Sequence, residues 1–206
     1  MAKRSAPEVN AGSMADIAFL LLIFFLVTTT IPKDSGISRK LPPMDDNEQQ
    51  EDVILKQKNI FTVVINRSDR LLVEGEPMEI QNLREAAVAF LDNNGDGSCE
   101  FCEGERDPAS SDNPEVAVIS LENNRETTYA AYISVQNELV AAYNELRNRR
   151  ALEIGPQRGF PNMNFVEMQE ASNNVQWVGD KDKLKEVILQ IQEEIPQKLA
   201  EVSSTN

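Results

Sequence analysis

An apolar run near the start of the chain limits its possible folds more than any other part of the sequence. Residues 17–27 read IAFLLLIFFLV, without a single polar side chain. Extended to 11–31, the segment contains one charged residue, Asp16. At about 1.5 Å of rise per residue, a helix of that length measures about 31 Å, which matches the hydrocarbon thickness of a bilayer. The sequence therefore predicts one transmembrane helix over 11–31.

A cleaved signal peptide is the alternative interpretation, with Lys3 and Arg4 as its basic start. Two features argue against it: an acid directly precedes the apolar run, and no pair of small residues typical of a cleavage site follows it. Basic residues flank both ends of the segment, so charge alone does not decide which end faces the cytoplasm.

Asp16 is the most informative single residue. An ionised Asp at the centre of a membrane helix costs about 2.5–3.5 kcal/mol, so an acid in a span is a functional candidate by default. Asp16 lies about one turn inside the N-terminal boundary, which lowers that cost. An acid that stays at the membrane interface is the alternative.

Composition excludes several other classes of function. The chain of 206 residues has a net charge of −14, and the excess of acids lies after Asp16. Such a surface repels nucleic acid, so DNA and RNA binding are poor hypotheses. Histidine is absent, which removes the commonest general base and transition-metal ligand. We therefore expect no enzyme activity.

Residues 13–27, SMADIAFLLLIFFLV, resemble the transmembrane signature of the ExbD/TolR family. In that family an Asp opens a span rich in Leu, Ile and Phe that ends near a proline, here Pro32. Flagellar-stator B subunits share the Asp-then-apolar pattern, but they carry a larger peptidoglycan-binding domain for which we find no matching segment. The resemblance implies a bacterial inner-membrane protein with residues 1–10 in the cytoplasm and the C-terminal domain in the periplasm.

The resemblance also implies a function. Two such helices, one from each chain of a homodimer, would sit inside a ring of ExbB-like subunits, with Asp16 as the proton carrier. The proton-motive force would then drive work that a TonB-like partner delivers to outer-membrane transport. The resemblance leaves open whether the pathway is ExbD-like or TolR-like. The alternative is a membrane-tethered periplasmic interaction domain, stabilised by calcium and without proton chemistry.

After the span we expect a flexible linker over 32–58 and a folded domain over 59–206. The fold class is predicted to be α+β, a small ββαβα core with a C-terminal helix and strand as an extension. The predicted strands are 60–65, 71–74, 116–121 and 198–202. The predicted helices are 79–92, 128–148 and 181–194. Residues 92–114 read as an insertion, and the glycines and prolines of 155–161 as a loop.

The insertion begins with a sequence that fits the calcium loop of an EF-hand. Oxygen ligands would come from Asp92, Asn94, Asp96, the Ser98 carbonyl and Glu103. A plain turn rich in Asn, Asp and Gly is an equally good interpretation.

Cys99 and Cys102, the only cysteines, lie within the same loop. Zinc would need two further ligands, so a disulfide in an oxidising periplasm is the simplest prediction.

Overall fold

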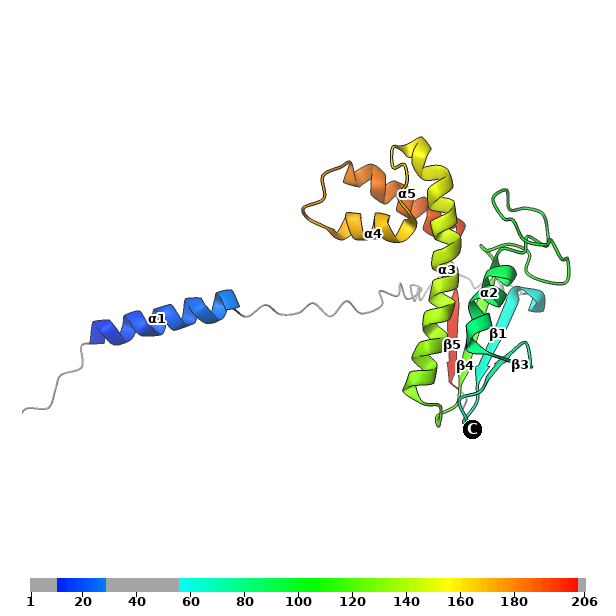
Figure 1. Cartoon of the computed structure of the whole chain (residues 1–206), viewed down its shortest axis with the longest axis horizontal. Coiled ribbons are helices and arrows are strands. Elements are labelled where there is room, and N and C mark those ends of the chain that lie inside the picture. Colours follow the sequence, from blue (N-terminus) through cyan, green and yellow to red (C-terminus); the bar gives the residue numbers. More distant parts are fainter. Residues whose placement is uncertain (1–10, 29–55, 204–206) are drawn as a thin grey trace, which may run out of the picture. The chain divides into compact units, whose positions relative to one another are not determined.

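The computed structural model describes residues 11–28 and 56–203 (Figure 1). The chain divides into two compact units, residues 1–51 and 52–206.

The described part of the first unit is one helix, α1 (Ala11–Thr28). Its 18 residues correspond to about 27 Å of length. The large apolar side chains from Met14 to Phe25 are 41–62% exposed. No helix among the described residues combines the length and hydropathy needed to cross a membrane. Residues 29–31 of the predicted span, and 32–55 of the predicted linker, lie outside the described residues.

The second unit is a mixed α+β domain, as the sequence predicts. A short 3₁₀ turn (Gln57–Asn59) leads into a five-stranded sheet with the order β3-β2-β1-β4-β5. The strands are β1 (Ile60–Ile65), β2 (Leu71–Val73), β3 (Glu76–Met78), β4 (Val118–Asn123) and β5 (Leu199–Ser203). The helices are α2 (Ile80–Leu91), α3 (Tyr129–Arg158), α4 (Phe165–Asn173) and α5 (Lys181–Glu194).

The sheet is antiparallel on one side of β1 and parallel on the other. β1 pairs antiparallel with β2, with Val63 opposite Val73, and parallel with β4, with Ile60 opposite Val118. Side chains alternate along β1, so that Phe61, Val63 and Ile65 are buried on one face. The buried residues of α2 and α3 pack against that face, and the two helices lie side by side (Figure 1). This is the first hydrophobic core.

A second core forms where α3 continues beyond the sheet. It brings together the end of α3, α4 and α5 through Ala151, Ile154, Phe160, Phe165, Met168, Ala171, Leu184, Val187, Ile188 and Ile191. Arg147 lies buried between the two cores. Its Nε and Nη2 donate to the Ile195 carbonyl at 3.0 and 2.8 Å, and its guanidinium lies 5.2 Å from the centre of the Phe165 ring. Burial lowers the pKa of Arg147 to about 10.

Most predicted elements are confirmed within about two residues. The strand 60–65 and the helix 181–194 have the predicted bounds. The strand predicted at 116–121 lies at 118–123, and the helix predicted at 79–92 spans 80–91.

The loop predicted at 155–161 is wrong in its first half, because α3 runs through Gly155 and Pro156 to Arg158. Gly155 is a packing residue: a Cβ there would lie 2.8 Å from the Phe160 carbonyl oxygen. The helix ends instead at Gly159, whose φ of 92° closes it with a left-handed residue.

Two elements, β3 and α4, were not predicted. β3 follows a tight turn in which Glu74 and Gly75 both have positive φ, as a two-residue hairpin of primed type requires. α4 begins with a capping box between Asn164 and Glu167.

Candidate functional site

Asp16 lies in the first half of α1, and its side chain is exposed. One turn further along the helix come Phe19 and Leu20, each 59% exposed. Residues before and after Asp16 on the other faces, such as Met14 and Ile17, are also exposed and apolar. The carboxylate is therefore the single charge on a helix that is apolar on every side. A surface of this kind requires cover from lipid or from other apolar helices.

The insertion leaves the domain at the C-terminal end of α2. Asn93, only 3% exposed, lies at the start of the insertion and connects it to residues 107–111. Its Nδ2 donates to the carbonyls of Asp107 and Ser111 at 2.8 and 2.7 Å, and its Oδ1 accepts from the Asp107 N–H at 3.0 Å. One buried amide thus satisfies backbone groups that would otherwise be left without partners.

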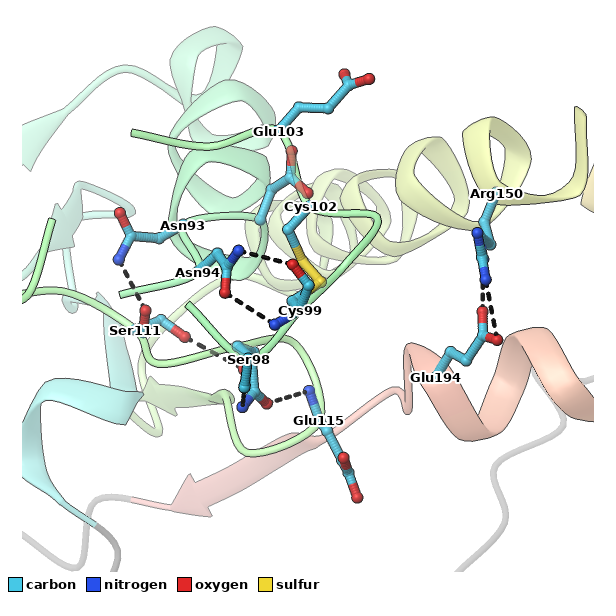
Figure 2. The surroundings of a disulfide bond; sticks show 12 residues. Asn93, Asn94, Ser98, Cys99, Cys102, Glu103, Ser111, Glu115, Arg150 and Glu194 are labelled. Carbon is cyan, nitrogen blue, oxygen red and sulfur yellow. Dashed lines mark hydrogen bonds and ion pairs between the residues drawn. A yellow bond between two sulfur atoms is a disulfide. The ribbon is translucent and has the colours of Figure 1, made fainter. Parts of the chain in front are cut away.

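Asn94 holds the cysteine-containing turn in the same way (Figure 2). Its Nδ2 donates to the Cys99 carbonyl at 2.8 Å, and its Oδ1 accepts from the Cys99 N–H at 2.9 Å. Cys99 and Cys102 form a disulfide with 5.6 Å between their Cα atoms, the pairing that the sequence predicts. The turn between them carries Phe101, whose ring contacts Arg150 of α3.

The acidic side chains predicted to bind calcium are engaged with protein groups. Arg149 of α3 pairs with both Asp92 and Glu103, at 2.5 and 3.3 Å. The Asp96 carboxylate accepts from the backbone N–H and hydroxyl of Ser98, and these two bonds lower the pKa of Asp96. Among residues 11–28 and 56–203, no group of three or more Asp, Glu, Cys or His side chains is placed to hold a metal ion. Calcium binding in this loop stays a prediction.

Asp112 is a buried acid that the sequence interpretation missed. Its carboxylate accepts from Lys56 Nζ and Asn59 Nδ2, both at 3.1 Å, and pairs closely with Lys58 Nζ. The Asp112 N–H in turn donates to Asn59 Oδ1 at 2.8 Å. The hydrogen bonds from Lys58 and then Asn59 hold the pKa of Asp112 far below its usual range. These partners lie 53–56 residues away, so no local pattern could have revealed them.

Arg150 connects the insertion to the second core. Its guanidinium lies 4.5 Å from the centre of the Phe101 ring, in the turn that the disulfide closes. Its Nε also donates to Glu194 at 2.6 Å, at the end of α5 (Figure 2). The insertion and the C-terminal extension both depart from a simple ββαβα unit, and both contact Arg150 of α3.

Comparison with known proteins gives the family. The family described as "Biopolymer transport protein ExbD/TolR" matches residues 2–149. This chain belongs to the ExbD/TolR family. The Vibrio cholerae serotype O1 protein named "Biopolymer transport protein exbD2" is 26% identical over 96 residues, which cover 47% of this chain and 67% of that relative. Proteins of this family are membrane-associated transport accessory proteins.

The matched range contains Asp16, β1 to β4 and the insertion. It ends at residue 149, so that the whole second core and β5 lie beyond it.

Proposed function

We propose that this protein is the small, single-span subunit of a proton-driven inner-membrane motor, with Asp16 as its proton carrier. The observation that carries the proposal is the placement of Asp16: it is the only charge on a helix with apolar side chains on every face, in a chain of the ExbD/TolR family. We assign no catalytic activity to the protein.

The surface of α1 supports a membrane position. A helix that packs on its own domain needs one apolar stripe, whereas the apolar side chains of α1 point in all directions. In the proposed arrangement residues 11–31 span the bilayer, 1–10 lie in the cytoplasm and 59–206 in the periplasm. The Cys99–Cys102 disulfide supports this topology, because disulfides persist in oxidising compartments.

Asp16 then works by alternating between two states. The protonated side chain is neutral and can pass apolar surfaces, whereas the ionised side chain requires a polar partner. A proton gradient that loads the carboxyl from one side and unloads it to the other biases this alternation in one direction. An ExbB-like ring around two copies of α1 would supply the apolar and polar surfaces, and a TonB-like protein would receive the work.

The first test asks whether the protein assembles with a ring-forming partner and whether cells need it for uptake that depends on the proton gradient. The full-length chain, purified from its native membrane in mild detergent, should retain a ring-forming membrane protein. Cells that lack the gene should lose an uptake process that depends on the proton gradient. A chain that purifies without any ring-forming partner, and whose loss leaves such uptake intact, would instead be a tethered interaction domain without proton chemistry.

A further inference from the structure

The insertion 92–114 is fastened to the place where the chain enters the domain. Lys56, Lys58 and Asn59 all contact Asp112. These residues precede the first ladder pair of β1, Ile60 with Val118. Among the described residues of the domain, 56–59 are therefore the first that a pull along the covalent chain from α1 would load, and they precede the sheet.

The contacts at Asp112 are of unequal strength. The Asn59 side chain makes a reciprocal pair with Asp112, through its own amide and the Asp112 N–H, and both residues are buried. Lys58 is 27% exposed and also donates to the Pro108 carbonyl at 3.0 Å. Lys56 is 67% exposed, so solvent screens its ion pair. Asn59 and Lys58 are thus the main attachments.

The insertion is held together next to its junction with α2. Inside it, the Ser111 carbonyl accepts from Asn93 Nδ2 and from the Gly95 N–H, and the Gly104 N–H donates to the Asp92 carbonyl at 3.1 Å. At the junction, the Asp92 N–H donates to the Val88 carbonyl of α2 at 2.9 Å. The backbones at Asp92 and Gly104 approach so closely that a Cβ on Gly104 would lie 2.4 Å from the Asp92 carbonyl oxygen.

The next step inward is the helix itself. α2 ends in Phe90 and Leu91, which are buried in the first core. Asp112 is therefore connected to that core through its neighbour Ser111, the Asn93 amide and the buried end of α2.

We propose that the insertion 92–114 is a force-transmitting anchor: it passes force that arrives at Lys56 into α2 and the first core, and Asp112 is the positioning residue on which this transfer depends. The inference rests on the proposed function, because a motor subunit must transmit work between α1 and the domain. Asp112 carries no proton in this scheme. Its role is to fix residues 56–59 to the insertion.

Single-molecule force measurements on residues 52–206, the compact unit that contains both cores, test the anchor directly. One pair of handles, on a tag before residue 52 and on a cysteine replacing Glu145, loads the chain through Lys56. A second pair, on cysteines replacing Glu85 and Glu145, pulls on α2 and α3 and bypasses the anchor. The native disulfide stays oxidised throughout.

Asp112→Asn keeps the size of the side chain and removes its charge. It should raise the rupture rate under constant load about tenfold when force enters through Lys56, and by less than about twofold on the bypass path. Glu138→Gln is the matched control: it removes the partner of Arg84, a pair between α2 and α3 that does not touch residues 56–59. It should leave the rate through Lys56 unchanged within about twofold.

An unchanged rupture rate through Lys56 in Asp112→Asn would overturn the anchor. Equal acceleration on both paths would also overturn it, because Asp112 would then serve general stability alone. Neither result depends on a proton gradient or a partner. Failure of the motor assignment would appear separately, as full activity of a chain that lacks the Asp16 carboxyl.

Discussion

α1 and the domain at 56–203 distribute their apolar residues in opposite ways. In the domain, large side chains such as Leu83, Leu121 and Leu184 are fully buried, and charges lie mostly at the surface. In α1, the described large apolar side chains are 41–62% exposed around a single acid. The domain completes its own core, whereas the apolar side chains of α1 do not form one. In the proposed function, lipid and partner helices cover them. The proposed proton chemistry lies in the second kind of region, and the anchoring of force in the first.

The largest expected effect separates the two regions by stability. Leu121→Ala in β4 removes a fully buried side chain from the first core and should lower the free energy of unfolding by about 2–5 kcal/mol. Leu21→Ala in α1 should leave the unfolding of the domain unchanged, because Leu21 is 51% exposed and belongs to the other compact unit.

Denaturation of the full-length chain in detergent, followed by the fluorescence of Trp177 at the second core, compares the two variants. A similar loss in both would mean that α1 contributes to the stability of the domain, and the contrast between the regions would be lost.

A smaller effect on stability is expected from the disulfide in the insertion. Replacing Cys99 and Cys102 by serine should cost the domain about 1–2 kcal/mol, because the disulfide closes only a very short loop. The same bond gives a check on topology. Thiol labelling of the intact protein without reductant should modify neither cysteine, and two freely reactive thiols would contradict both the bond and the periplasmic position of the domain.

The smallest effect is expected from calcium. Millimolar calcium should raise the melting temperature of residues 52–206 by a few degrees at most, because the ion must displace Arg149 from Asp92 and Glu103. Arg149→Gln frees both acids and should enlarge the shift. Melting both proteins with calcium and with a chelator makes the comparison. If the melting temperature does not change in either, residues 92–103 form a plain turn.

The sequence predicts best where a regular pattern meets a simple environment. The β-branched and aromatic residues of 60–65 predict a strand, and the helical spacing of the apolar residues in 181–194 predicts a helix, both with the observed bounds. Gly155 and Pro156 are typical helix breakers, but α3 runs through both, and close packing against Phe160 explains the glycine. The start of α4 did have a local signal, the capping pair Asn164 and Glu167, which was overlooked.

The residues of the candidate site also differ in how far the sequence alone reveals them. Asp16 and the cysteine pair stand in short motifs, so the sequence alone could single them out. Asp112 looks like any surface acid in the sequence, because its burial depends on Lys58 and Asn59, more than fifty residues earlier. Arg149 and Arg150 likewise acquire their roles only when α3 packs beside the insertion. Contacts between distant segments are the part that sequence patterns cannot supply.

The proposed function depends on proton exchange by Asp16, and a single substitution can remove that exchange. Asp16→Asn preserves size and hydrogen bonding but leaves no ionised state to alternate with the neutral one. It should leave membrane insertion and ring assembly intact, since a neutral amide is no costlier to bury than an ionised acid. Asp34→Asn, the same chemical change just beyond the predicted span, is the matched control. The measurement is gradient-dependent uptake in cells that make each protein at equal levels. We predict that Asp16→Asn abolishes uptake while Asp34→Asn retains it; wild-type uptake with Asp16→Asn would contradict the account.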